Sequence, residues 1–390
     1  MKKAVMFLII IFLLLPLPTL AADGPEDQPG FSFQDTMKSI DLEIMEEYKS
    51  QIDGEISSYI DSTPVKEWFI DFVKGDWEFN GLEAGQNLVK YLFKEIIANS
   101  DLLGKLLILS VIAALLINVQ TSFSAGVGQI SYLACFLALC AIALGSFKIV
   151  LGIGQQTIDN MVAFMLGMLP QMLVLTAGLG NINASVILFP ILMTTAAAFA
   201  NAIKHVVFPL IIMSAVLSLV NQMSEGLKVQ RLAKFFGELA KISLGFFVTV
   251  FVGIVTIRAI YASALDKVAL RTTKYVADNA IPVIGKMFSD TIEVAAGYVV
   301  LLKQAFGIFG VLIVLGIIVF PLAKIVALAI IYKVAAAVAE PLGDSRTAAI
   351  LETMGAHLML MLSAVAAVGL MFLIMIGIVA GISNHIVMLR

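Results

Sequence analysis

Residues that commonly carry enzymatic chemistry are sparse in this chain and far apart. Its three histidines show no His-Glu-x-x-His spacing, which is the arrangement that binds zinc in many hydrolases. The nearest approach to a phosphate-binding loop ends in Gly285-Lys286-Met287, and it lacks the first glycine and the hydroxyl residue that would hold magnesium. Asp344 is a lone acid, whereas aspartic proteases pair two carboxylates. We therefore expect no enzymatic activity, cofactor or metal. The histidines are His205, His357 and His385.

Prolines and glycines within apolar stretches are more informative. Pro170, Pro190 and Pro209 fall in three consecutive predicted membrane spans, where proline removes a backbone hydrogen bond and bends a helix. Broken helices can build a substrate site at the middle of a membrane, although ordinary packing is the simpler explanation of a kink. Gly178 and Gly180 permit a tight turn or a close helix contact. These five residues are our first candidates for the wall of a conduit.

The ionisable side chains near the predicted spans do not support a coupled transporter. No aspartate or glutamate falls inside a predicted span, whereas a proton- or sodium-coupled transporter usually keeps a buried carboxylate there. Lys148 and Arg258 lie near predicted span ends, from which their side chains can reach the membrane surface. Lys204 and His205 lie at a predicted turn. The pattern therefore argues against coupled transport.

The elements that position these residues are apolar helices. Of the 390 residues, 60% are hydrophobic and 14% are charged, whereas soluble domains are about 45–50% apolar and about 25% charged. No water-soluble fold hides so much apolar surface. The composition predicts an all-α, polytopic helical membrane protein.

The charge distribution divides the chain into three parts. Residues 1–22 have a basic start, an apolar run, two prolines and a small-residue exit, which predicts a secretory signal peptide rather than an uncleaved first span. Residues 23–101 carry a net charge of −12, and residues 102–390 carry +7. We predict a small, acidic, helical extracytoplasmic domain followed by a polytopic transmembrane domain. Apolar residues recur every three or four positions in the acidic part, and we expect these stripes to pack on each other.

Stretches of about 20 apolar residues predict the membrane spans. Residues 184–220 are too long for one span, so we expect two short ones with a turn near Asn201. Ile242–Tyr261 is either a span or a re-entrant hairpin, which leaves the total at eight or nine and the side of residues 265–296 open. The other predicted spans are Leu102–Val119, Ile130–Val150, Met161–Leu179, Gly297–Phe320, Leu322–Ala339 and Gly355–Ile382.

Several short segments together resemble one known family. The series Met168-Leu169-Pro170-Gln171, Gly178-Leu179-Gly180 and Phe189-Pro190 is similar to the central part of stage III sporulation protein AE. The resemblance covers the whole chain and rests on a distributed pattern. Other matching segments are Ala280-Ile281-Pro282-Val283-Ile284-Gly285, Leu302-Lys303, Tyr332-Lys333 and Ala339-Glu340-Pro341-Leu342-Gly343-Asp344.

The resemblance implies a role in endospore formation. It adds Lys303, Glu340 and Pro341 to the conduit candidates and assigns no catalytic residue. The family is one of eight co-encoded proteins made in the mother cell, which assemble in the membrane around the forespore. They meet stage II sporulation protein Q from the forespore side and are thought to form a channel or secretion-like conduit.

This chain would be the large polytopic subunit of that complex, in contact with membrane lipid and with no nucleic acid. Its acidic domain would lie in the intermembrane space. A stand-alone permease for a small solute is the alternative that the residues leave open.

Overall fold

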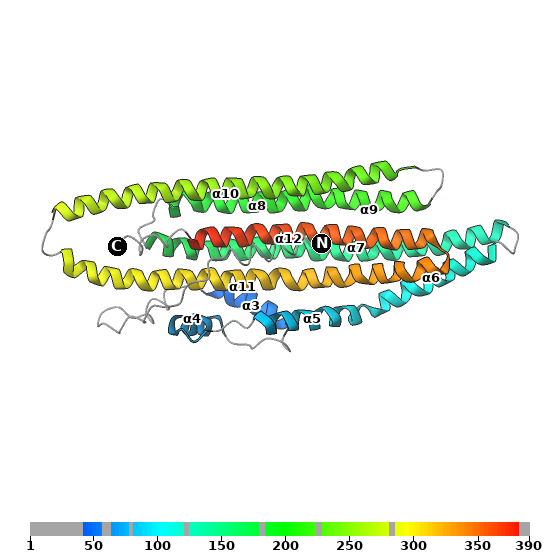
Figure 1. Ribbon diagram of the computed structural model, residues 1–390, viewed down its shortest axis with the longest axis horizontal. Coiled ribbons are helices and arrows are strands. Elements are labelled where there is room, and N and C mark those ends of the chain that lie inside the picture. The colour runs from blue at the N-terminus through cyan, green and yellow to red at the C-terminus, as the bar shows by residue number, and fades with distance from the viewer. Residues whose placement is uncertain are drawn as a thin grey trace.

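A computed structural model of the chain describes residues 42–56, 64–77, 81–120, 125–178, 184–223, 228–280 and 285–381. The signal peptide predicted for residues 1–22 lies outside the described residues, as does Gly180. Regular structure in the described part is helical, and the long helices lie side by side in an elongated bundle (Figure 1). The prediction of an all-α protein is therefore confirmed.

The helices fall into a short N-terminal group and a long group. The short group is α3 (Glu43–Ile56), α4 (Val65–Lys74) and α5 (Gly81–Ala98). The long group is α6 (Ser100–Gln120), α7 (Ala125–Gly178), α8 (Phe189–Ala202), α9 (Phe208–Met223), α10 (Gln230–Ala280), α11 (Gly285–Ala339) and α12 (Ser345–Gly381). Two π-helices, η1 (Ala184–Leu188) and η2 (Ile203–Val207), precede α8 and α9, and the 3-10 turn η3 (Glu340–Leu342) follows α11.

Six helical stretches in the described residues are long and apolar enough to cross a membrane. Several of them run through positions where the sequence predicted a boundary. Leu133–Ala177 joins two predicted spans in one 45-residue stretch, which is about 67 Å of helix against a hydrocarbon core of about 30 Å. The total of eight or nine spans is thus not confirmed and stays a prediction. The other stretches are Ser100–Ile117, Pro190–Gln222, Gln230–Tyr261, Val299–Leu342 and Ser345–Gly381.

The turn predicted near Asn201 is wrong. Asn201 is the penultimate residue of α8, and the helix continues through the π-helical turns of η2 into α9. Helical hydrogen bonds satisfy every backbone group at membrane depth, whereas an open turn there would leave groups without partners. Polar residues in an apolar stretch therefore do not by themselves mark a turn.

The α11–α12 pair forms the centre of the bundle. The two helices run antiparallel and are joined by η3 and Gly343, whose φ of 91° lies in the left-handed region that glycine tolerates. Asp344 precedes α12 and caps its start, because its carboxylate accepts a hydrogen bond of 3.0 Å from the backbone N–H of Thr347. Close approach occurs where Gly307 faces Ala380 and where Gly369 faces Ile318.

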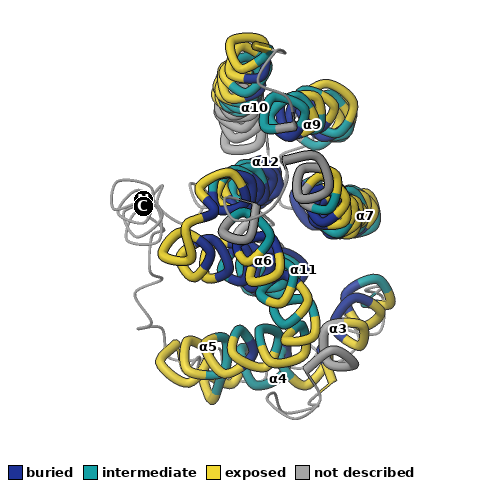
Figure 2. Tube along the Cα trace, turned by 90° about the vertical axis from the view of Figure 1, so that its right-hand side faces the viewer, coloured by how far each residue is buried: buried dark blue, intermediate teal, exposed yellow. Residues whose placement is uncertain are grey.

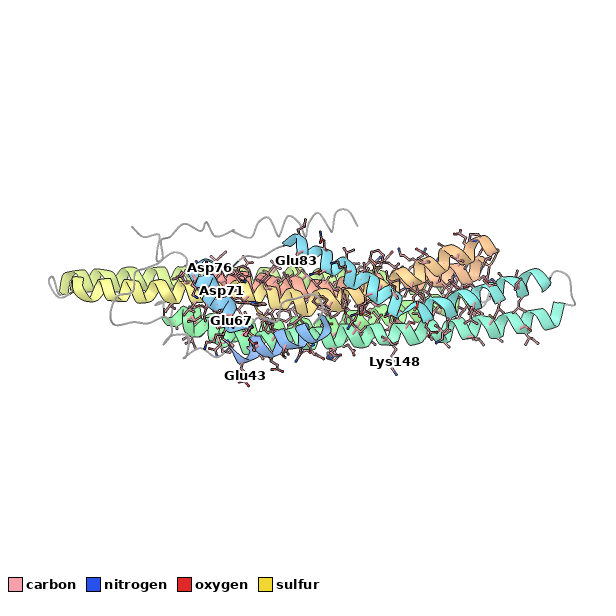
Figure 3. All side chains as sticks on the ribbon, turned by 90° about the horizontal axis from the view of Figure 1, so that it is seen from below. Glu43, Glu67, Asp71, Asp76, Glu83 and Lys148 are labelled. Atoms are coloured by element: carbon pink, nitrogen blue, oxygen red, sulfur yellow. The ribbon has the colours of Figure 1, made fainter. Side chains whose placement is uncertain are left out.

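The short helices form a layer on the long ones. Phe69 of α4 lies with its ring centroid 4.9 Å from those of both Phe306 and Phe309 of α11. Tyr48 of α3 packs edge-on against Phe164 of α7. The expectation that these helices pack chiefly on each other is therefore wrong for the described residues, because their apolar stripes lie against α7 and α11. Figure 3 labels five acidic residues of this layer, Glu43, Glu67, Asp71, Asp76 and Glu83.

Candidate functional site

Two of the predicted prolines lie at matching places in the fold. Pro190 and Pro209 are the second residues of α8 and α9. Each of these two helices directly follows a five-residue π-helix. Proline cannot donate to the carbonyl four residues earlier and its ring crowds that carbonyl, so a wider π-helical turn before it relieves the conflict. Pro170 differs, because it lies half-buried inside an α7 that continues as α-helix. The prolines therefore reshape the helices without ending them.

The remaining predicted residues are not brought together. Gly178 is the last residue of α7. Glu340 and Pro341 are exposed in the η3 turn. Lys303 lies in the first half of α11, about 55 Å of helix away from Glu340 at 1.5 Å per residue. The structure thus gives no single site that contains all the predicted residues.

Lys303 is the most unusual of them. Its side chain is 1% exposed, and its ammonium Nζ has no hydrogen-bond partner within the described part of the chain. Phe306, one helical turn further along α11, is the residue on which Phe69 of α4 packs. Lys303 therefore lies next to the junction between the N-terminal layer and the long helices.

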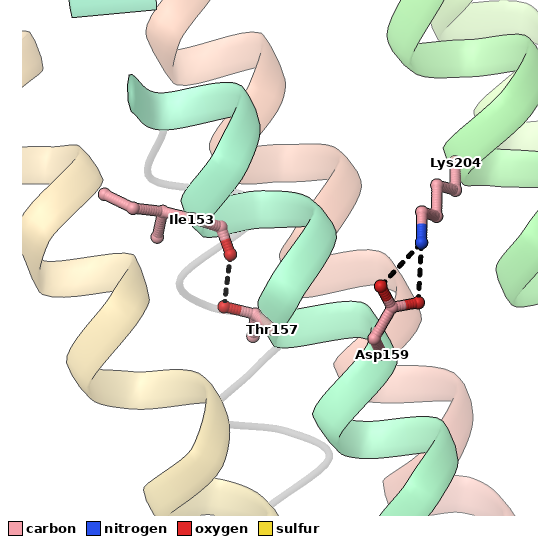
Figure 4. Close-up of polar contacts among 4 residues, drawn as sticks. All are labelled: Ile153, Thr157, Asp159 and Lys204. Carbon is pink, nitrogen blue, oxygen red and sulfur yellow. Dashed lines mark hydrogen bonds and ion pairs between the residues drawn. The ribbon is translucent and has the colours of Figure 1, made fainter. Parts of the chain in front are cut away.

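An ion pair joins two of the long apolar helices. Nζ of Lys204, in η2, donates to both carboxylate oxygens of Asp159, in α7, at 2.7 and 2.6 Å (Figure 4). The Lys204 side chain is 19% exposed and that of Asp159 is 56% exposed. Two residues before Asp159, the Thr157 hydroxyl donates to the Ile153 carbonyl of its own helix, so it does not compete for the carboxylate.

Asp159 bears on one inference from the sequence. Residues between Val150 and Met161 were placed outside the spans, whereas Asp159 lies within the continuous stretch Leu133–Ala177. A carboxylate is therefore present within a continuous apolar helix, between the two spans that the sequence predicts. The sequence shows a single acid between two apolar runs, but it does not show whether the helix continues through that acid.

A second polar junction lies between α9, α10 and α12. The Ser214 hydroxyl lies 2.8 Å from the Ala233 carbonyl and 2.9 Å from Nε2 of His357. Nδ1 of His357 lies 2.7 Å from the carbonyl of Thr353. Sequence reasoning treated His357 as isolated because its partner stands 143 positions away. This junction ties three helices together.

These features define a polytopic helical membrane protein whose long apolar helices carry a few paired or enclosed polar groups. Groups of three or more His, Cys, Asp or Glu side chains suited to a metal ion do not occur among the residues that the structure describes. Comparison with known sequences narrows the class further.

The family described as stage III sporulation protein AE matches residues 63–383. Stage III sporulation protein AE of Bacillus subtilis (strain 168) is 31% identical over 356 residues, which cover 91% of this chain and 89% of that protein. The chain belongs to the stage III sporulation protein AE family. No solved structure shows significant similarity to it.

Proposed function

We propose that this chain is a membrane subunit of the mother-cell sporulation channel that connects mother cell and forespore after engulfment. The family match along nearly the whole chain carries the proposal. Six apolar helical stretches agree with a subunit that is embedded in the membrane. The chain acts as a structural, conduit-forming component and not as an enzyme.

The proposed assembly implies a location for each part of the chain. The long helices lie in the mother-cell membrane that surrounds the forespore, and the acidic layer of α3–α5 lies in the intermembrane space. The other stage III sporulation A-operon proteins bind this subunit directly, and stage II sporulation protein Q meets the complex from the forespore side. The exposed acids of the layer support this arrangement, because they require water beside α4 and α5.

A clean deletion in the spore-forming host tests the proposal. We expect engulfment to be completed while a late forespore reporter stays silent, the forespore collapses and heat-resistant spores are lost. A wild-type copy at another locus should restore all three readouts. Normal sporulation of the deletion strain would refute the proposal.

Purification tests the conduit-subunit role separately from the sporulation phenotype. An affinity-tagged copy that complements the deletion should bring down other proteins of the operon from sporulating cells. The same membranes without the tag serve as the control. Recovery of the tagged chain alone, from cells that sporulate normally, would contradict the role in a complex.

A stand-alone permease for a small solute is the second candidate, and Asp159 is the observation that favours it. A carboxylate within an apolar helix is a common ion or proton site in coupled transporters. Saturable uptake by proteoliposomes that contain this chain alone, abolished by Asp159→Asn, would support the permease. Flux that does not saturate and is unchanged by Asp159→Asn would exclude the permease.

A further inference from the structure

The outer side of α10 begins with positive charge. Arg231, Lys234 and Lys241 are exposed on its N-terminal part. Glu238 is the only acid among residues 228–241. Arginine and lysine at a membrane surface attract anionic headgroups and keep contact with water, whereas they are costly in the hydrocarbon interior. This part of α10 therefore favours a headgroup region over hydrocarbon.

The next part of α10 is apolar and also exposed. Residues 242–257 contain no ionisable side chain, and Arg258 follows them. The side chains of Ile242, Phe246 and Ile257 are exposed. The stretch is about 24 Å of helix at 1.5 Å per residue. Lysine and arginine side chains at its two ends can reach outward, so the stretch matches a hydrocarbon core about 30 Å thick.

The central helices carry uncharged stretches at the same level. Ser214 joins the Ala233 carbonyl of α10 to His357 of α12, so Ala233 and His357 lie level with each other. α10 and α12 run in the same direction (Figure 1), and residues 358–381 of α12 contain no ionisable side chain. α11 meets α12 through the glycine contacts described above, and its residues 304–323 contain none either. Three neighbouring helices therefore place uncharged stretches side by side.

Charged groups elsewhere in the bundle do not contradict lipid beside α10. The Phe199 ring packs on the rings of Phe247 and Phe251. Lys204 follows Phe199 on the antiparallel rod of α8, η2 and α9, so it lies near the basic end of the apolar stretch, where Asp159 balances its charge. The acidic layer of α3–α5 lies on the opposite side of the bundle from α10 (Figure 2). Water beside the layer is therefore compatible with lipid beside α10.

The hairpin of α6 and the first half of α7 extends beyond this level (Figure 1). Lys324 ends the uncharged stretch of α11 on the basic side. About 12 Å of helix further along α11, the Tyr332 hydroxyl donates to the Ile142 carbonyl of α7. Another 10 Å or about two turns along α7, the Cys135 thiol donates to the Leu109 carbonyl of α6. Leu109 therefore lies about 22 Å beyond Lys324, outside a core about 30 Å thick that covers the apolar stretch of α10.

We propose that phospholipid covers the outer face of α10, with the hydrocarbon core between Lys241 and Arg258. Arg231 and Lys234 then bind anionic headgroups at one surface of the membrane. Because α10 is one continuous helix, it crosses the membrane once, and its residues 265–280 lie on the side opposite its basic end. The hairpin of α6 and α7 lies outside the core, although its composition alone predicts a span. This location goes beyond the proposed channel role and does not depend on it.

Nitroxide spin labels on the full chain test this location in vesicles of phosphatidylcholine and phosphatidylglycerol. Cys135 and Cys140 are first replaced by alanine, so that each protein carries one introduced cysteine. Phe246→Cys and Thr249→Cys then probe the middle of the apolar face of α10, where both native side chains are exposed. Leu232→Cys, also at an exposed position, is the matched control at the basic end of the same helix.

Collisions of the nitroxide with two reagents distinguish lipid, water and protein as its neighbour. Oxygen concentrates in hydrocarbon, whereas a polar nickel chelate stays in water. We expect the ratio of oxygen to nickel collisions to be about tenfold higher for Phe246→Cys and Thr249→Cys than for Leu232→Cys, because a polar solute avoids hydrocarbon. Ile108→Cys, at an exposed position of the hairpin, should give a low ratio like that of Leu232→Cys.

Three results would overturn the proposal. Frequent nickel collisions at both apolar positions of α10 would mean that water covers this face. Rare collisions with both reagents would mean that protein covers it, either a second copy or another part of the chain. A high ratio for Ile108→Cys would mean that the core lies at the level of the hairpin. The phenotype of the deletion strain reports on the channel role and does not enter this measurement.

Discussion

Two antiparallel helix pairs in this molecule are built in opposite ways. The α11–α12 pair approaches closely through Gly307 and Gly369, and its contact surface is almost wholly apolar. The pair formed by α7 and the α8–η2–α9 rod is held by an ion pair and interrupted by π-helices. Both pairs lie in apolar stretches of similar composition.

The difference indicates a division of roles. Glycine-mediated packing gains dispersion energy over a long surface and requires no polar group, so it suits a scaffold. Ion pairs at membrane depth carry a desolvation cost that packing alone does not require, and such groups usually mark functional surfaces. We therefore interpret α11–α12 as the scaffold and the α7 side as the working surface.

The largest expected effect is on the scaffold. A Cβ atom at Gly307 would lie 2.8 Å from Cβ of Ala380, and neither atom can move away by a side-chain rotation. We expect Gly307→Val to push α11 and α12 apart and to destabilise the protein by about 2–3 kcal/mol. Equilibrium unfolding of the purified protein in mixed micelles measures this change.

Gly377→Val is the matched control. Gly377 lies in α12, where an added Cβ would meet nothing within 4 Å. We expect this variant to unfold within about 0.5 kcal/mol of the wild type, as changes away from tight contacts usually do. Equal losses in both variants would mean that valine disturbs the helices themselves, and the assignment of α11–α12 as a close-packed scaffold would fail.

The sequence predicted the helical membrane class because composition and apolar run length decide it directly. It also showed the family resemblance, since the matching segments around Pro170 and Glu340 are local in sequence. It failed where the answer depends on distant partners. Asp159 and Lys204 stand 45 positions apart, and nothing local to either residue indicates the other.

Continuity of the helices was the second failure. The sequence predicts a boundary between Val150 and Met161 and a turn near Asn201, yet polar residues are tolerated inside a helix that its neighbours support. The positions of the close glycine contacts were not predicted either. Close contacts between α11 and α12 occur at Gly307 and Gly369, which the sequence did not single out. Spacing alone does not reveal which face of a helix meets a neighbour.

A smaller effect is expected at the ion pair. Lys204→Met leaves Asp159 without its partner, and we expect a loss of about 1–2 kcal/mol, between the values for exposed and buried pairs. Asp159→Asn alone should cost a similar amount or less. The double variant should lose less than the two single losses together, by about 1 kcal/mol, because the two residues interact directly. Unfolding in mixed micelles for all four proteins gives this coupling.

Strict additivity would contradict the contact between Asp159 and Lys204. The same four proteins also sharpen the comparison between the two helix pairs. If the α7 side is a working surface, the double variant should keep most of its stability and still fail to restore sporulation. A double variant that is stable and sporulates normally would make the ion pair an ordinary packing element.

The smallest expected effect is at Lys303, which is the one ionisable residue of α11 buried without a partner among the described residues. Lys303→Met keeps the length of the side chain and removes the charge, so we expect a gain of about 1 kcal/mol in unfolding free energy. Lys333→Met is the control, because Lys333 is exposed on the same helix and should change stability little.

The sign of the Lys303 result separates two explanations. A gain in stability together with lost sporulation would mean that the lysine is kept for function at a cost to the fold, which would extend the working surface to α11. A gain in stability with normal sporulation would mean that the α11–α12 pair serves only as a scaffold and tolerates one buried lysine. A loss of stability would show that Lys303 has an anionic partner, and the contrast between the two helix pairs would then be weaker than the described contacts indicate.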